Sequence, residues 1–142
     1  MLRNIPPVMS PELLKTIHEM GHSDFIIIAD ANFPASDLAK RYIRLDGVES
    51  TDLLDAILRF FPLDDFVDKP VVLMQPRLQE PEPEIWQVYQ KIIHDRDEEK
   101  IFSGFHSIDR LDFYEYAKKA YAIVQTGTTV RYANISIQKG VI

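Results

Sequence analysis

The chain has 142 residues, no cysteine and a formal net charge of −6. Its length suits one domain over residues 1–142, and the absence of cysteine excludes disulfides, cysteine-ligated metals and a thiol nucleophile. The acidic balance, without a Lys/Arg cluster, predicts no nucleic-acid partner.

The apolar runs of the chain predict no membrane partner. The longest wholly apolar run, Phe25–Ala29, is too short to cross a bilayer, and residues 1–7 lack the apolar stretch of a signal peptide. We therefore expect a cytoplasmic protein.

Helical and strand patterns alternate along the chain. In chain order we expect a helix between Ser10 and Gly21, strands at 25–29 and 42–45, a helix at 51–61, a strand at 71–75, a helix at 85–93, a strand at 102–107, a helix at 109–119 and strands at 121–125 and 132–138.

The strand patterns indicate the fold class. Residues 25–29 and 71–74 form continuous apolar runs, which are typical of strands covered on both faces. Only a short turn at Thr126-Gly127 separates the last two strands, which favours a mixed sheet. The sequence therefore predicts a single-domain, three-layer α/β/α sandwich with a mixed, largely parallel sheet.

Asp30 is the first candidate site residue. It directly follows the apolar run, and ligands of open α/β sheets bind outside the carboxyl ends of strands. A carboxylate in that place needs a hydrogen-bonding partner. Two interpretations remain open: a general base or hydroxyl ligand, and a buried Asp that caps the turn at residues 32–34.

His22 and Arg110 are further candidates with polar chemistry. His22 lies between Gly21 and the first strand, where an imidazole transfers protons near neutral pH or satisfies a helix-end carbonyl. Arg110 begins the helix that Asp109 caps, and it binds either a ligand or a neighbouring carboxylate.

Tyr132 and Asn134 fall on one face of the last expected strand, with Ala133 between them. An aromatic ring beside an amide suits a sugar, which needs an apolar platform and directed hydrogen bonds. The alternative is an edge-strand tyrosine and a turn asparagine.

The remaining motifs are weak. The His, Asp and Glu residues do not have the spacing of a metal site, and the sequence contains no Gly-rich phosphate-binding loop. We therefore expect neither a metal nor a cofactor. His106 is near Arg110 in sequence and is a candidate for the same pocket. Asp30-Ala31-Asn32 is superficially similar to the start of haloacid dehalogenase-type phosphatases, but Asn32 replaces their second Asp.

Three blocks of residues occur together in the chain. They are Leu13-Leu14 with Glu19–Asp24 and Ile28–Pro34, then Ile108–Arg110 with Phe113–Glu115, Ala117–Ala120, Ala122–Val124 and Thr126-Gly127, and last Tyr132–Ile135 with Lys139–Val141. Taken together, these blocks resemble the RbsD/FucU family, which comprises ribose pyranases and fucose mutarotases. The resemblance covers nearly the whole chain, and Arg110 with Phe113–Glu115 is similar to the fucose branch.

This resemblance implies an RbsD-like fold and a cofactor-independent isomerase. The implied reaction is mutarotation, the interconversion of the α and β anomers of a free monosaccharide, with L-fucose as the expected sugar. The implied oligomer is a ring-shaped homodecamer with sites where subunits meet. The resemblance implies His22 as proton donor and a sugar-binding set of Asp30, Arg110, Tyr132, Ala133 and Asn134.

Two alternatives remain open. One is a D-ribose pyranase, which interconverts pyranose and furanose forms by the same ring opening, and the other is a monosaccharide-binding protein without turnover. Phe25, Asn32 and Ala133 depart from the fucose branch, and Ala133 matches the ribose branch.

Overall fold

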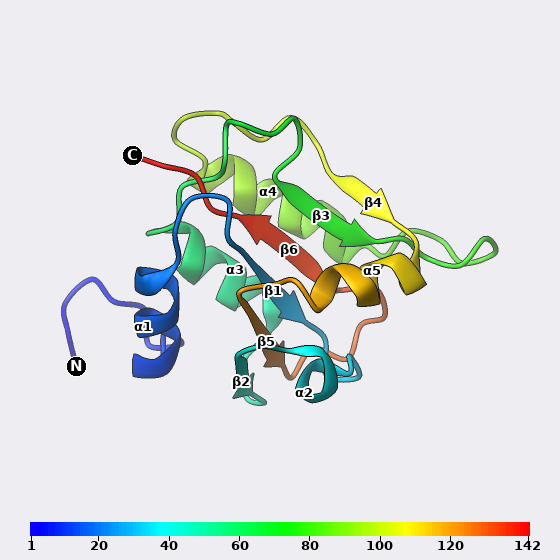
Figure 1. The fold of residues 1–142 in the computed structure, drawn as a ribbon, viewed down its shortest axis with the longest axis horizontal. Helices are drawn as coiled ribbons and strands as arrows, with labels where there is room; N and C mark the ends of the chain where they lie inside the picture. The colour runs from blue at the N-terminus through cyan, green and yellow to red at the C-terminus, as the bar shows by residue number, and fades with distance from the viewer.

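Helices and strands alternate along the chain in the computed structural model, which describes residues 1–142 (Figure 1). The elements are α1 (Pro11–Glu19), β1 (Phe25–Ala29), α2 (Ala35–Leu38), β2 (Tyr42–Leu45), α3 (Ser50–Leu58), β3 (Val71–Met74), α4 (Ile85–Arg96), β4 (His106–Ile108), α5 (Arg110–Ala117), β5 (Ala122–Thr126) and β6 (Ile135–Gln138).

All strands join one six-stranded sheet in the order β2-β5-β1-β6-β3-β4. β6 is antiparallel to β1 and to β3, whereas the pairs β1–β5, β2–β5 and β3–β4 are parallel. The expectation of a mixed, largely parallel sheet is confirmed. The last two strands are not neighbours, however, because β1 lies between them.

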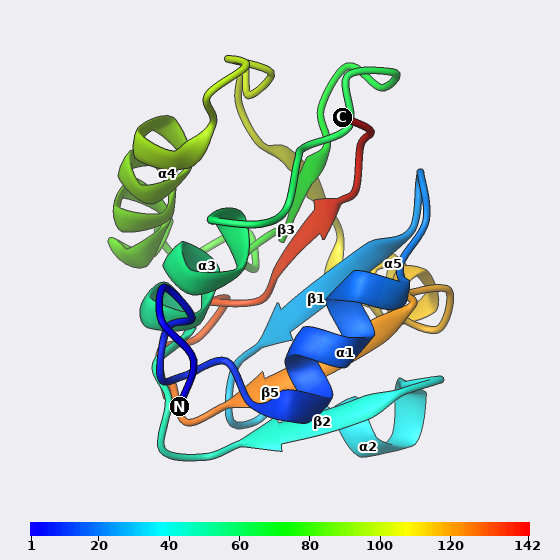
Figure 2. The ribbon, with the colours of Figure 1, turned by 90° about the vertical axis from the view of Figure 1, so that its left-hand side faces the viewer.

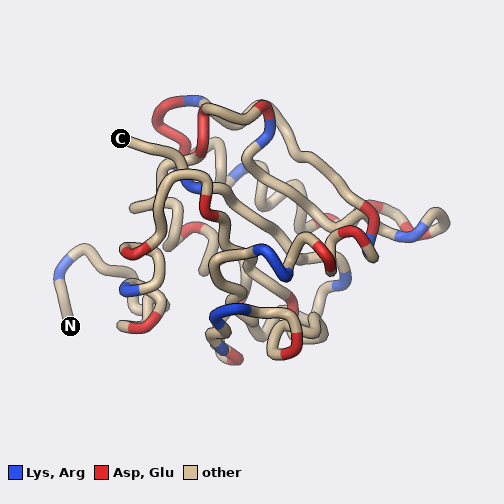
Figure 3. The backbone as a smooth tube through the Cα atoms, in the orientation of Figure 1, with Lys and Arg blue, Asp and Glu red and all other residues tan.

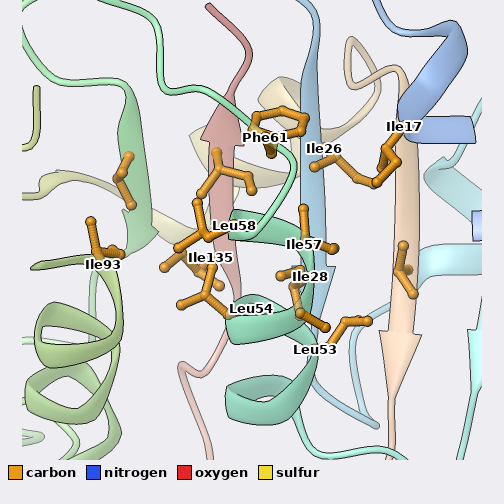
Figure 4. Close-up of a cluster of buried hydrophobic side chains, with 14 of the residues drawn as sticks. Ile17, Ile26, Ile28, Leu53, Leu54, Ile57, Leu58, Phe61, Ile93 and Ile135 are labelled. Carbon is orange, nitrogen blue, oxygen red and sulfur yellow. The ribbon is translucent and has the colours of Figure 1, made fainter. Parts of the chain in front are cut away.

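Helices cover both faces of the sheet, as the continuous apolar runs predicted (Figure 2). Ile26 and Ile28 of β1 point into the larger core, which contains residues of α1, α3 and α4 (Figure 4). Ile27 and Ala29 point the other way, into a smaller core with residues of α2 and α5. Alternate side chains of one strand therefore fill two separate cores.

Several boundaries differ from the sequence prediction. α4 extends to Arg96, whose Nε donates to Oδ1 of Asp55 on α3 at 2.7 Å. The strand expected at 102–107 is shorter, because Phe102 packs in the core while its backbone N–H donates to Asp97 rather than to a strand. The short helix α2 was not predicted.

Charged residues of both signs are mixed along the folded chain. Lys and Arg are interspersed with Asp and Glu along the chain and form no separate basic segment (Figure 3). None of the helices combines the length and the apolar character needed to cross a membrane.

Gly140 permits a close approach between the end of β6 and the segment that precedes β3. Its backbone N–H donates to the carbonyl of Pro62 at 2.8 Å, and Leu63 forms a β-bridge with Lys139. A Cβ at Gly140 would lie 2.3 Å from the Leu63 carbonyl oxygen, far inside van der Waals contact. Only glycine fits here without moving the segment.

Gly140→Ala is therefore expected to destabilise the protein by about 1–3 kcal/mol, the usual cost of overpacking. Gly47→Ala is the matched control, because no atom lies within 4 Å of a Cβ at that position. Thermal unfolding at equal protein concentration measures both. Equal melting temperatures for the two variants would contradict the steric argument.

Candidate functional site

The polar residues gather at the edge of the sheet where the parallel strands end. β1, β3 and β4 point toward this edge in Figure 1, while β6 runs the opposite way and begins there. A pocket of about 380 Å³ opens at this edge. Four residues expected from the sequence line it together: Asp30, Arg110, Tyr132 and Asn134.

Asp30 and Asn134 are joined by two hydrogen bonds across the ends of adjacent strands. The backbone N–H of Asp30 donates to Oδ1 of Asn134 at 2.8 Å, and Nδ2 of Asn134 donates to Oδ2 of Asp30 at 3.0 Å. The other oxygen of Asp30 accepts from the backbone N–H of Asn32 at 2.9 Å. Asp30 thus caps the turn, as the second interpretation predicted, and it also lines the pocket.

Burial raises the pKa of Asp30 above its ordinary value, and the hydrogen bonds from Asn32, Asn134 and Phe33 only partly offset that rise. The residue is 6% exposed, so water solvates its charge poorly. A carboxyl group with a raised pKa is a stronger proton acceptor once ionised. Asp30 is therefore suited to accept a proton from a bound hydroxyl group.

Tyr132 has a backbone conformation that is rare for a residue with a side chain, at φ 60°. Two aromatic residues of α4 hold the following turn from behind. Nε1 of Trp86 donates to the carbonyl of Tyr132 at 2.8 Å, and the hydroxyl of Tyr89 donates to the carbonyl of Ala133 at 2.7 Å. The core thus fixes the loop that carries the pocket residues.

Ala133 differs from its expected neighbours, because it is fully buried and does not line the pocket. Its backbone carbonyl accepts the hydrogen bond from Tyr89 behind the pocket loop. His106, the additional histidine candidate, is exposed on the edge strand β4 and does not line the pocket either.

Arg110 is placed by the start of α5. Asp109 caps that helix by accepting a hydrogen bond from the backbone N–H of Leu111 at 3.0 Å. The Arg110 guanidinium lies 5.5 Å from the centre of the Tyr114 ring, and Nη1 donates to the Tyr114 hydroxyl at 3.4 Å. This contact places the positive charge at the wall of the pocket.

Sequence reasoning missed the rest of the lining. Phe33 gives the pocket an apolar wall, and Arg77 and Glu80 enter from the loop after β3, with Arg131 pairing to Glu80 at 3.4 Å. The neighbouring Glu80 raises the pKa of Tyr132 above its ordinary value. The rule that drew attention to Asp30 also applies to Arg77 and Glu80, because both follow the carboxyl end of a strand, where ligands of open α/β sheets bind.

His22 lies at the opposite edge of the sheet from the pocket. It precedes β1, whereas Asp30 follows β1, and five strand residues at about 3.3 Å each separate the two edges by roughly 16 Å. Its Nε2 is 3.1 Å from Oδ1 of Asp64, and its ring is 4.8 Å from that of Phe66. The structure therefore brings together four of the expected residues within one chain but not His22.

No group of three or more His, Asp or Glu side chains is arranged to hold a metal ion.

Comparison with known proteins identifies close relatives. Over 99% of the chain and 97% of the relative, the sequence is 43% identical to an L-fucose mutarotase of Haemophilus influenzae. The crystal structure of a fucose mutarotase from Streptococcus pneumoniae in complex with L-fucose matches with a TM-score of 0.94 at 45% identity, covering 99% of both chains.

A more distant match extends the fold to the ribose side of the family. Bacillus subtilis RbsD in complex with D-ribose has a TM-score of 0.75 at 21% identity over 100% of this chain and 99% of that one, which is a likeness of fold. The family model described as the RbsD / FucU transport protein family matches residues 3–142. The chain belongs to the RbsD/FucU family.

Proposed function

We propose that this protein is a cofactor-independent mutarotase that interconverts the α and β anomers of free L-fucose. The observation that carries the proposal is the pocket of Asp30, Arg110, Tyr132 and Asn134, in a chain 45% identical to the S. pneumoniae fucose mutarotase over 99% of its length. The relatives from H. influenzae and mouse are also named fucose mutarotases.

The pocket has the chemistry that a monosaccharide needs. Phe33 and Tyr132 offer apolar faces to the C–H groups of a sugar ring, while Asp30 and Asn134 offer directed hydrogen bonds to its hydroxyl groups. The pocket volume, about 380 Å³, falls within the range of small-molecule sites. Arg110 adds the guanidinium donors that its contact with Tyr114 leaves free.

Mutarotation requires two proton movements. One group accepts the proton of the anomeric hydroxyl, and another donates a proton to the ring oxygen as the bond between C1 and that oxygen breaks. The open aldehyde turns about its C1–C2 bond, and the ring closes on its other face with the roles reversed. We assign the acceptor to Asp30, because its raised pKa suits it to that step, and the donor to His22.

The proposal places each site between two copies of the chain. His22 and the pocket lie on opposite edges of one sheet, so a neighbouring copy has to supply the histidine. Closed rings form from such heterologous contacts, in which one edge of each copy meets the other edge of the next. A homodecameric ring is the assembly that the family resemblance implies, and an apolar Phe66, 73% exposed beside His22, suits such a contact.

The same proposal takes residues 1–142 as one domain and places the protein in the cytoplasm. The single sheet and the family match over residues 3–142 support one domain. A chain without cysteine is compatible with the reducing cytoplasm.

The decisive test is NMR saturation transfer between the α and β anomeric protons of L-fucose, with D-ribose measured alongside. We expect faster exchange on L-fucose, and a loss of about 10²–10⁴-fold in His22→Ala, the usual contribution of a general acid. A folded His22→Ala variant with full activity would remove His22 from the mechanism.

The other outcomes separate the alternatives. Acceleration on D-ribose alone would make the protein a pyranase. Sugar binding measured by calorimetry, without acceleration of either exchange, would make it a binding protein.

Coexpression of two inactive variants tests whether sites form between copies. In mixed assemblies of His22→Ala and Asp30→Asn chains, we expect about a quarter of the sites to combine an intact His22 with an intact Asp30 from different chains. Exchange should then return to a corresponding fraction of the wild-type rate. No recovery in verified mixed oligomers would place both residues of a site on one chain.

The hydrogen bond behind the pocket gives a further prediction. Tyr89→Phe removes a buried hydroxyl that bonds to Ala133 and Ser50, and Tyr116→Phe removes a part-buried hydroxyl that bonds to Ser136. Each should cost about 1–3 kcal/mol of stability. Only Tyr89→Phe should also weaken sugar binding, by roughly fivefold or about 1 kcal/mol, because it frees the pocket loop. Equal effects of both variants on KM would contradict this role.

A further inference from the structure

Gln125 is a polar side chain on a buried strand, and the proposed mechanism does not use it. It lies on β5 with 7% exposure, between the buried residues Val124 and Thr126. Alternation along the strand places it on the face of the smaller core, together with Ile123. A buried amide is costly unless its hydrogen-bonding groups are paired, so its partners show what it contributes.

Both hydrogens of the amide bind the turn that follows β1. Nε2 of Gln125 donates to the carbonyl of Ala31 at 2.9 Å and to the carbonyl of Phe33 at 3.1 Å. Carbonyls only accept, so Oε1 faces the other way, where it accepts a hydrogen bond from the hydroxyl of Tyr42. Tyr42 on β2 therefore fixes the orientation of the amide.

These bonds continue the sheet beyond the end of β1. Ala29, the last residue of β1, pairs with Gln125 in the parallel ladder. The side chain of Gln125 then reaches the carbonyls that follow Ala29 in the turn. Ala31 is also held through its backbone N–H, which donates to the carbonyl of Thr128 at 2.8 Å. β5 and the residues just after it thus hold the turn at several points.

The turn carries part of the pocket. Asn32 lies between the two bound carbonyls, and both Asn32 and Phe33 line the pocket. The ring of Phe33 packs edge-on against Phe113, with centres 5.9 Å apart, and tilted against Tyr114 at 5.7 Å. Tyr114 also lines the pocket and contacts Arg110. The arrangement of this wall therefore depends on where the turn holds Phe33.

The amide of Gln125 is not needed to fill space in the core. The smaller core otherwise consists of apolar side chains, and one of similar length would occupy the same volume. The amide differs from such a side chain only in its hydrogen bonds, which end at the turn and at Tyr42. Fully paired buried polar groups make the structure around them more rigid.

We infer that Gln125 is a positioning residue, which holds the Ala31–Phe33 turn and so fixes Phe33 as the apolar wall of the sugar pocket. This inference rests on the proposed function, because it concerns the pocket that binds the sugar. Asp30 stays anchored without Gln125, because Asn134 bonds to both its backbone N–H and its carboxylate. Gln125 therefore affects sugar binding rather than proton transfer.

Gln125→Met tests this role, because it removes the amide at similar length. We expect the KM for L-fucose exchange to rise about 2- to 10-fold, the equivalent of one hydrogen bond, with kcat nearly unchanged. Ser136→Ala is the matched control, because Ser136 is also a buried polar residue of a central strand, but its partner Tyr116 does not line the pocket. The control should leave KM unchanged.

A double-mutant cycle separates positioning from a general loss of stability. If Gln125 acts through Phe33, Gln125→Met causes little further rise of KM in a Phe33→Ala background. A further rise of equal size there, or a wild-type KM in folded Gln125→Met, would overturn the inference.

Tyr42→Phe covers the case in which Gln125→Met does not fold. Tyr42 is only half-buried, and the change removes the one donor that orients the amide. Binding of L-fucose, measured by calorimetry, should then weaken about two- to threefold. Unchanged binding would overturn the inference. A wild-type protein that neither accelerates the exchange nor binds L-fucose would instead refute the proposed function, so the two failures differ.

Discussion

The pair of hydrogen bonds between Asp30 and Asn134 determines the geometry of the pocket. β6 runs opposite to its neighbours, so its first residues arrive where β1 and β3 end. One amide therefore satisfies both the backbone N–H and the carboxylate of Asp30. A buried carboxylate without such donors is costly in a low-dielectric interior, and this pair allows one at the floor of a pocket.

The pocket residues found from the sequence share one property: each lies within a few residues of a strand end. Asp30 could be placed because a continuous apolar run has a visible boundary, whereas Tyr132 and Asn134 were expected inside a strand that in the structure begins only at Ile135. Arg77 and Glu80 also follow a strand end, but the loop rich in Pro and Glu that carries them has no periodicity to show which of its side chains face the pocket. The three layers could be predicted from the local hydropathy pattern, whereas the order of the strands in the sheet could not.

Long-range contacts explain what the sequence could not predict. Trp86 and Tyr89 have the spacing of an apolar helix stripe, and they are buried as that spacing indicates. Their second role, holding the pocket loop by its carbonyls, depends on α4 packing behind that loop. Asp64 is 42 residues from His22, and only the insertion of β6 between β1 and β3 brings their segments together.

On the proposed function, the two edges of the sheet divide the chemistry between them. The proposed sugar-binding residues lie at the carboxyl edge, where strand ends and helix starts converge, while His22 lies at the amino edge beside Asp64, held by the end of β6. On that proposal neither edge contains a complete set for ring opening, so a second copy has to complete each site. The proposed assembly is then a condition for the proposed activity, because it is what brings the two edges together.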